Sequence, residues 1–443
     1  MKRRDLLKQG IALGGLSLGG LSWPSLAFAS PTTQRHFVFV WFRGGWDILL
    51  GLDPRNPDVF NEEQMAFTRI QTGYDRLPTG FQAPVETGVP GMILGPYIGN
   101  LQGKADRLAV IRGINMETLG HAQGMRRFLT GKAPVGLNAK GSSLATVIAD
   151  LYGAQKPISN LCFGVETYND GLDIAASGLS VDSLSDLLKL LEEPAGGVLD
   201  QQSRQLIDSF IMNNVDASKS VFMANALMAH QSAQDLLDQD LGAHFYFDQP
   251  EHSDLRAAFN LTQNSATDSS DPNVRAALAG KALTAGLSRC VSIQINPTSL
   301  DTHDDNWQDV HGPIQMGGFD AINSLIDYLD GEDYGDGSSW MDHTTIVGFS
   351  EFSRTALLNS RGGRDHALTN AAFLIGSGIK AGVYGASTDI GLGIQAIDLS
   401  TGLPDVGGVV LKPEHIHRAL LSSIGFQDDV ADLRVDPFTA FLL

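Results

Sequence analysis

The fold is decided by the stretch HFVFVWF at residues 36–42, which is followed by the turn RGGWD at residues 43–47. Apart from His36, every residue of this run is apolar, which predicts a strand buried on both faces. Similar runs predict strands at 108–114, 290–295, 344–349 and 371–375. Between them, apolar residues at helical spacing predict helices at 144–152, 310–329 and 413–424. This alternation predicts an α/β fold with a mostly parallel sheet and helices on both faces.

Residues 180–285 have a different pattern. The segment is almost wholly helical in character, and an apolar stripe runs from Leu206 to Leu227. Such a stripe is typical of a helix packed against a core. We therefore expect one α/β domain over residues 30–443, with a helical insertion at about 180–285.

The first 29 residues have the features of an export signal. A basic head at residues 2–4 precedes a weakly apolar stretch, and AFA at residues 27–29 is a small-x-small cleavage site. RRDLLK at residues 3–8 resembles the twin-arginine signal, with an ordinary secretory signal as the alternative. The apolar stretch is too short and glycine-rich for a stable membrane span. We expect the twin-arginine machinery to export a folded chain, starting at Ser30, to the periplasm or the extracellular medium.

Composition narrows the function classes. The chain of 443 residues is 43% hydrophobic and 18% charged, which is typical of a globular protein. Its formal net charge of −19 disfavours binding to nucleic acid, because phosphate backbones are repelled. Cys162 and Cys290 are the only cysteines, too few for a zinc ribbon or an iron–sulfur cluster, and their sequence context leaves a disulfide and buried thiols equally open. Beyond the predicted export signal, no dinucleotide fingerprint, P-loop or Gly-x-Ser-x-Gly elbow is present.

Carboxylates and imidazoles recur where the predicted strands end. They occur in the segments 43–47, 115–121, 301–305 and 350–354, and in 362–366 just before the fifth strand. Taken singly, an Asp after a strand more often caps a helix than binds a ligand. Together these segments would converge on the carboxyl edge of the sheet, where α/β proteins bind ligands. Mixed Asp, Glu and His side chains suit zinc, manganese or iron better than calcium, so we expect one or two divalent ions there.

Three motifs carry a family resemblance. The segment 37–47, the sequence SEFSRT at 350–355, and GRDH at 363–366 followed by IKAGVYG at 379–385 resemble the domain-of-unknown-function 1501 family. The resemblance covers most of the chain beyond the export signal and is weakest in the predicted insertion. It implies an exported bacterial protein whose core is similar to the alkaline phosphatase and sulfatase superfamily.

The superfamily pattern can be carried onto this chain residue by residue. It implies metal ligands or their hydrogen-bonding partners at Asp47, Asp301, His303, Glu351, Asp365 and His366. Glu351 and Phe352 stand where phosphatases have Asp-His, so one imidazole is missing. The nucleophile position, nine residues before Thr130, is occupied by His121, and the nearest upstream hydroxyl is that of Thr118.

The missing nucleophile leaves three possibilities. His121 could be a nucleophile or a ligand, a metal-activated hydroxide could attack directly, or catalysis could be lost. Four arginines near the motifs could clamp an anionic group: Arg43, Arg126, Arg354 and Arg364. The resemblance implies an exported, metal-dependent hydrolase of phosphate or sulfate esters, acting on an anionic small molecule or polymer. The alternative is a non-catalytic exported protein that uses the same rim to bind an envelope partner or polymer.

Overall fold

The computed structural model describes residues 34–152, 156–192 and 240–443 without interruption. Between 193 and 239 it describes only residues 203, 206, 207, 209–211, 223 and 227. The predicted export signal at 1–29 lies outside the described residues, as do Val215 and Phe222 of the apolar stripe from Leu206 to Leu227. Of the described stripe residues, Leu206, Ile207 and Phe210 are exposed rather than packed in a core. The described residues belong to one unit, Pro31–Leu443.

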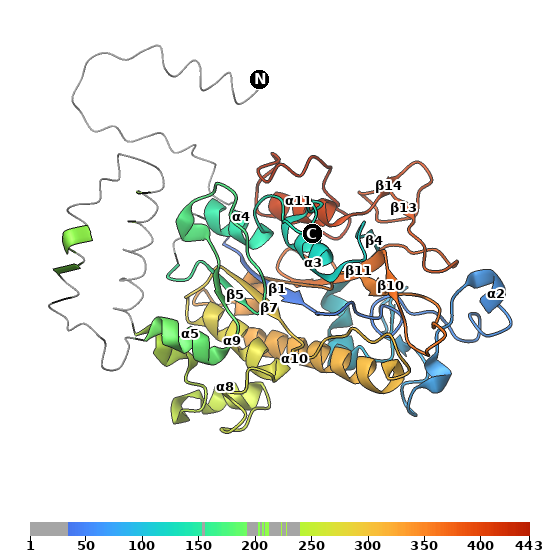
Figure 1. Cartoon of the computed structure of the whole chain (residues 1–443), viewed down its shortest axis with the longest axis horizontal. Helices are drawn as coiled ribbons and strands as arrows, with labels where there is room; N and C mark the ends of the chain where they lie inside the picture. Colours follow the sequence, from blue (N-terminus) through green and yellow to red (C-terminus); the bar gives the residue numbers. More distant parts are fainter. Residues whose placement is uncertain are drawn as a thin grey trace, which may run out of the picture. The chain divides into compact units, whose positions relative to one another are not determined.

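An eight-stranded sheet forms the centre of this unit (Figure 1). The strand order is β12-β4-β11-β8-β1-β7-β5-β6. In chain order the strands are β1 (His36–Trp41), β4 (Leu108–Asn115), β5 (Asn160–Phe163), β6 (Leu179–Val181), β7 (Cys290–Gln294), β8 (Thr344–Phe349), β11 (Thr369–Gly376) and β12 (Gly382–Gly385). All five predicted strands are present. The three that were not predicted, β5, β6 and β12, have only three or four residues each, too few for a clear pattern.

One strand breaks the parallel arrangement. Strand β11 runs antiparallel to both of its neighbours, β4 and β8, whereas the other pairs of the sheet are parallel. Thr369, the first residue of β11, pairs with Asn115, the last residue of β4. The residues that precede β11 therefore lie at the edge where the parallel strands end.

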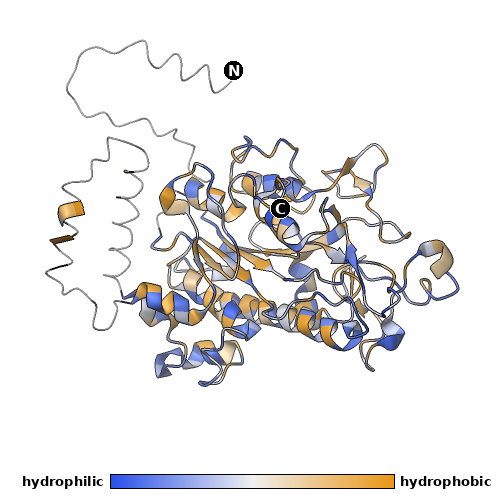
Figure 2. Cartoon of the chain, viewed as in Figure 1, coloured by the Kyte–Doolittle hydropathy of each residue, from blue (hydrophilic) through white to orange (hydrophobic). Residues whose placement is uncertain are grey.

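Helices cover both faces of the sheet, as predicted. Helices α3 (His121–Thr130), α4 (Leu144–Leu151) and α11 (Pro413–Ser423) lie on one face, and α9 (Pro272–Thr284) and α10 (Gly312–Gly331) on the other (Figure 1). Successive side chains of β1 point to opposite faces of the sheet, so the strand contributes to the hydrophobic core on each face. Phe37 and Phe39 pack with the first group of helices, whereas Val38 and Val40 pack with the second. Figure 2 shows the hydrophobic residues concentrated on the strands and on the helix faces toward them.

The part of the predicted insertion that the structure describes contains α5 (Leu184–Leu191), α8 (Ser253–Ala258) and α9. Cys162 and Cys290 lie on the neighbouring strands β5 and β7 as free, buried thiols. Among the described residues, no helix has the length and apolar character needed to cross a membrane.

Short elements complete the described chain. They are α2 (Met65–Thr68), the paired strands β2 (Val85–Glu86) and β3 (Ile93–Leu94), β9 (Ser353–Arg354) and β10 (His366–Ala367), β13 (Ala396–Ile397) and β14 (Val409–Val410), and 3-10 turns at Tyr74–Arg76, Gly99–Arg107, Ile174–Ala176, Leu241–Phe245, Pro250–His252 and Trp340–His343. A π-type turn, Trp307–His311, precedes α10, so the helix predicted at 310–329 begins at Gly312. In the β9–β10 pair, Arg354 lies directly opposite His366.

Candidate metal centre

Seven polar side chains meet at the carboxyl edge of the sheet, and we call them the rim cluster. Its members are His121, Asp301, His303, Glu351, Arg354, Asp365 and His366. Each comes from a segment that the sequence singled out. His121 begins α3, Asp301 and His303 follow β7, and Glu351 follows β8. The antiparallel direction of β11 places Asp365 and His366 at the same edge.

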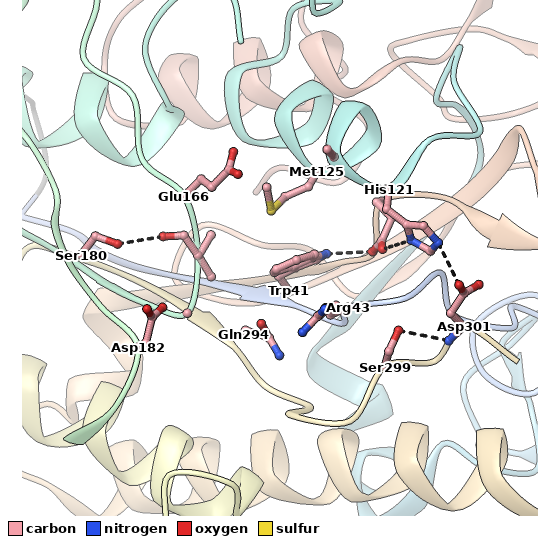
Figure 3. A pocket seen from close by; sticks show the side chains of 14 residues that line it. Trp41, Arg43, His121, Met125, Glu166, Ser180, Asp182, Gln294, Ser299 and Asp301 are labelled. Atoms are coloured by element: carbon pink, nitrogen blue, oxygen red, sulfur yellow. Dashed lines mark hydrogen bonds and ion pairs between the residues drawn. The ribbon is translucent and has the colours of Figure 1, made fainter. Parts of the chain in front are cut away.

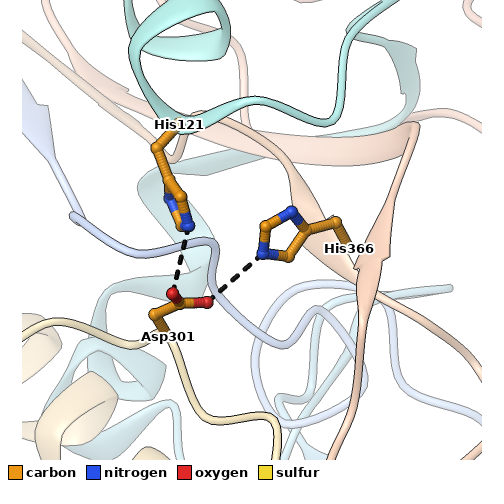
Figure 4. A group of neighbouring side chains, drawn as sticks. All are labelled: His121, Asp301 and His366. Atoms are coloured by element: carbon orange, nitrogen blue, oxygen red, sulfur yellow. Dashed lines mark hydrogen bonds and ion pairs between the residues drawn. The ribbon is translucent and has the colours of Figure 1, made fainter.

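Three imidazoles surround the carboxylate of Asp301. Nε2 of His121 lies 3.3 Å from Oδ2, and Nε2 of His366 lies 3.2 Å from Oδ1 (Figure 4). Nε2 of His303 is 2.9 Å from Oδ1 and 3.1 Å from Nε2 of His366. Three ring nitrogens therefore converge on one carboxylate.

The other nitrogen of each ring faces a hydrogen-bond acceptor. Nδ1 of His121 lies 2.8 Å from Oε1 of Glu351, and Nδ1 of His303 lies 2.7 Å from Oδ1 of Asp365. Nδ1 of His366 lies 2.7 Å from the carbonyl oxygen of Leu119. Because these acceptors are carboxylates or a carbonyl, each Nδ1 donates a proton, which leaves the Nε2 lone pairs directed at Asp301. Histidine ligands of metals are held in this way.

Glu351 and Asp365 act as holders of imidazoles. Glu351 is fully buried, and its carboxylate accepts hydrogen bonds from His121, from the indole of Trp41 at 2.8 Å and from the amide of Gly44 at 2.8 Å. Oδ1 of Asp365 accepts hydrogen bonds from His303 and from Asn359 at 3.0 Å. Of the two roles expected from the sequence, the geometry favours that of hydrogen-bonding partner over direct ligand for both residues.

The protonation states of Asp301 and His366 suit a cation site. Burial acts to raise the pKa of Asp301, but the hydrogen bond from Arg354 and the charge of this arginine hold the pKa well below its usual range. Burial lowers the pKa of His366, so its ring is neutral at neutral pH. The hydrogen bond to Glu351 raises the pKa of His121, so a metal ion at this ring competes with a proton. An ionised carboxylate and a neutral imidazole are the forms that bind metals.

The spacing of three ligand atoms fits one ion. One such atom from each of His121, Asp301 and His366 lies within 4.8 Å of the other two. Atoms bound at about 2.1 Å to one ion lie at most about 4.2 Å apart, so the largest separation must close by about half an ångström. In a tetrahedral zinc site neighbouring ligand atoms are about 3.3–3.4 Å apart. Nε2 of His121 lies at this distance from Oδ2 of Asp301, whereas the 3.2 Å contact of His366 is to the other oxygen, Oδ1.

Asp47 belongs to a different group, which we call the buried network: Asp47, Trp307, His311, Gln315 and Arg364. Oδ2 of Asp47 is 2.9 Å from Nε of Arg364 and accepts a hydrogen bond from the indole of Trp307 at 2.8 Å. The side chains of Arg364 and Asp47 are 0% and 1% exposed. Asp47, expected as a metal ligand, thus lies outside the rim cluster, where its carboxylate neutralises a buried arginine.

The turn after β1 explains this placement. Gly44 and Gly45 have φ values of 109° and 77°, a left-handed conformation that favours glycine. A Cβ on Gly44 would lie 2.3 Å from the amide nitrogen of Leu300, so the chain turns in close contact with the loop after β7. This turn carries Asp47 into the core and leaves Arg43 at the rim.

The four arginines expected to clamp an anion have different environments. Arg126 is paired with Glu166 at 2.8 Å and Arg364 with Asp47. Arg354 is buried and hydrogen-bonded to backbone carbonyls and to Asp301. The fourth, Arg43, is exposed, lines a cavity next to the rim cluster, and pairs with no carboxylate of the described residues.

This cavity has a volume of about 500 Å³ and opens along the carboxyl ends of β1, β7, β5 and β6 (Figure 3). His121, Asp301 and Glu351 line one end, with Arg43 and Ser299 beside them. The remaining wall combines apolar and polar side chains: Trp41, Ala122, Met125, Val165, Glu166, Ser180, Asp182 and Gln294, together with Gly164.

The proposed nucleophile positions differ in their surroundings. His121 lies in the rim cluster, where its two ring nitrogens face Glu351 and Asp301. The hydroxyl of Thr118 accepts a hydrogen bond from the amide of Gly120 at 3.2 Å and makes none with the described members of the rim cluster. Ser299, which sequence reasoning missed, places its hydroxyl on the cavity wall and accepts a hydrogen bond from the amide of Asp301 at 3.3 Å.

The packing role of Phe352 and the contact of Trp41 with Glu351 escaped sequence reasoning. The ring of Phe352 packs against His366 and His121 at centroid distances of 4.1 and 4.8 Å. Trp41 is the last residue of β1, and its indole donates a hydrogen bond to Glu351. The position of Phe352 directly after Glu351 could have indicated that it lies near the site. Nothing in the apolar run that contains Trp41 indicated its contact with Glu351.

Fold and site together define an α/β protein with a candidate metal centre at the carboxyl edge of its sheet. The chain belongs to the family described as "Protein of unknown function (DUF1501)", whose model matches residues 34–403. This match confirms the resemblance carried by the motifs. No curated protein matches the chain.

Three solved structures are similar to this chain at low identity. Ps i-CgsB in complex with k-i-k-neocarrahexaose has 10% identity and a TM-score of 0.39, over 91% of this chain and 75% of that one. A Bacteroides thetaiotaomicron protein from the metabolism of multiple glycosaminoglycans has 10% identity and a TM-score of 0.35, over 88% of this chain and 72% of that one. A mutant of TAB5 alkaline phosphatase with Mg bound in the M3 site has 11% identity and a TM-score of 0.32, over 80% of this chain and 95% of that one. TM-scores below 0.5 say nothing about the chemistry of this chain.

Proposed function

We propose that the protein is a metal-dependent hydrolase of phosphate or sulfate esters, with a divalent ion held by His121, Asp301 and His366. The observation that carries this proposal is the convergence of Nε2 atoms on Asp301, each from a ring whose Nδ1 donates to a fixed acceptor. Without a cation these lone pairs would face a carboxylate. Zinc or manganese suits this mixture of nitrogen and oxygen ligands.

When bound, such an ion supplies Lewis-acid chemistry, which polarises an ester and lowers the pKa of water. The chain supplies binding and orientation. Glu351 holds the ring of His121, and Phe352 packs against His121 and His366, so both imidazoles keep their direction. Arg43 offers a guanidinium for the anionic group of the ester, and the wall with Trp41 and Met125 receives the rest of the molecule.

Water is the nucleophile in this proposal. None of the seven side chains of the rim cluster carries a hydroxyl or thiol. Ser299 is the nearest hydroxyl on the cavity wall beside Asp301, and no described base contacts it. The reaction then proceeds without an ester bond to the protein.

The predicted export signal supports an expectation for the location. Twin-arginine export would deliver a folded chain, with its ion already inserted, to the periplasm or the medium. The substrate would be an anionic small molecule or polymer that occurs there. If the ion and Arg43 bind such a molecule without turnover, the protein has the binding role instead.

Elemental mass spectrometry of the exported protein tests the proposal, followed by a screen of phosphate and sulfate esters. We expect zinc or manganese in the wild type and in His244→Gln, a control outside the rim cluster, and its loss in His121→Gln and His366→Gln. Turnover of at least one ester should be lost with the metal. A wild type that stays metal-free in added zinc and manganese would refute the proposal.

A further inference from the structure

The guanidinium of Arg354 is anchored from all sides. Nε donates to the carbonyl of Gly45 at 2.9 Å, Nη1 to that of Arg364 at 3.2 Å, and Nη2 to those of Leu300 at 3.1 Å and of Gly44. The side chain is 0% exposed. Loops after β1 and β7 and before β11 thus fix one positive charge at this spot.

This fixed charge meets two of the atoms that a second metal ion would need. Nη2 of Arg354 lies 2.7 Å from Oδ1 of Asp301, and Nη1 lies 3.3 Å from Nε2 of His303. Oδ2 of Asp301 is left for an ion, and it lies 3.3 Å from Nε2 of His121. The carboxylate is divided between a guanidinium on one oxygen and a free position at the other.

The formal charges lead to the same result. With neutral imidazoles, the three carboxylates and one guanidinium of the rim cluster have a net charge of −2. One divalent ion neutralises this charge. A second divalent ion would raise the net charge of this half-buried site to about +2, and such a charge is costly without counter-charges.

From this geometry, and on the basis of the proposed function, we infer that the centre is mononuclear. Arg354 occupies the place of a second ion, and His303 stays outside the coordination sphere, where it accepts from Arg354 and donates to Asp365. Three protein ligands leave at least one coordination position open, as in catalytic zinc sites. His121 and Asp301 border the cavity, so the open position is accessible to a ligand there.

Manganese titration of the full-length protein, freed of metal by chelation, tests this inference. Bound manganese is counted by elemental analysis, and electron paramagnetic resonance shows whether ions are coupled. We expect saturation at one equivalent, with an uncoupled spectrum, in the wild type and in His303→Gln. His121→Gln should bind none at the same concentration.

The outcomes separate the inference from the proposed function. Two equivalents with a coupled spectrum would overturn the mononuclear assignment and leave the metal centre intact. Loss of manganese in a folded His303→Gln protein would also overturn it, because His303 would then be a ligand. No binding in the wild type would instead overturn the proposed function.

Discussion

The rim cluster and the buried network contain the same types of side chain, yet they differ in what these side chains leave unpaired. Each has a carboxylate next to an arginine and an imidazole. In the buried network, Asp47 pairs with Arg364, and Nε2 of His311 accepts from the amide of Asp47 at 2.9 Å. In the rim cluster, imidazole lone pairs face Asp301, whose side chain is 37% exposed. Residue type therefore does not define a metal site; the unused lone pairs and access from solvent do.

Breaking the buried ion pair should give the largest effect on stability. Asp47→Asn leaves the guanidinium of Arg364 buried without a counter-charge, so we expect a loss of about 3–5 kcal/mol. Urea unfolding measures it. The control is Asp304→Asn, which breaks the exposed pair with Arg361 and should cost about 0–1 kcal/mol. Equal losses in the two variants would mean that Asp47 is not part of a closed network.

Removing an imidazole of the rim cluster should weaken metal binding strongly and change the stability of the fold little. His366→Gln takes away one of three ligand atoms, so we expect metal affinity to fall by at least about 100-fold, or about 2.7 kcal/mol. The metal-free protein should keep its unfolding free energy within about 1 kcal/mol, because this ring is half-buried with one firm hydrogen bond. Competition with a chromophoric chelator measures the affinity. Unchanged affinity in the folded variant would remove His366 from the centre.

The pH dependence of stability distinguishes the two regions further. Burial lowers the pKa of His311 to about 3, so its neutral ring stabilises the fold above the unfolded pKa of 6.5. This contribution is lost as the pH falls from 6.5 toward 3. Between pH 7.5 and pH 5 the loss is about 2 kcal/mol for this residue. His311→Gln should flatten the dependence measured by urea unfolding by that amount, whereas an unchanged slope would show that His311 is protonated in the folded state.

Smaller effects are expected at the cavity. Arg43→Gln should weaken inhibition by inorganic phosphate or sulfate by about 1–2 kcal/mol, or about 5–30-fold, because a charge-assisted hydrogen bond is lost. Metal content should stay the same, which distinguishes anion binding from ion binding. Inhibition as strong as in the wild type would remove Arg43 from the substrate site.

The smallest effect is expected at Ser299. If water attacks the ester, Ser299→Ala should change turnover by less than about threefold, or about 0.7 kcal/mol. Steady-state kinetics on an ester found in the screen measures it. A loss of several hundred-fold at unchanged metal content would make Ser299 the nucleophile.

The sequence predicted the sheet and most of the rim cluster because both depend on local patterns. Unbroken apolar runs marked the central strands, and the polar residues after them had to meet at one edge. The sequence did not show that Asp47 pairs with Arg364, because the direction of Asp47 depends on the left-handed turn at Gly44 and Gly45. The role of Arg354 could not be predicted, since its partners are backbone carbonyls from separate loops.

Two further features depend on tertiary packing. The antiparallel direction of β11 brings His366 to the edge, and no pattern within residues 371–375 indicates that direction. Phe352 was noticed as a missing imidazole, whereas its ring packs against two imidazoles. In both cases the decisive partner is distant in sequence, so a single chain read locally does not reveal it.

Anomalous diffraction from crystals of the zinc- or manganese-loaded protein tests the central claim most directly. We predict a single peak about 2.1 Å from Nε2 of His121, a carboxylate oxygen of Asp301 and Nε2 of His366, with none between Arg354 and His303. A loaded crystal without a peak at the rim cluster, or with its peak at Asp47, would contradict the account.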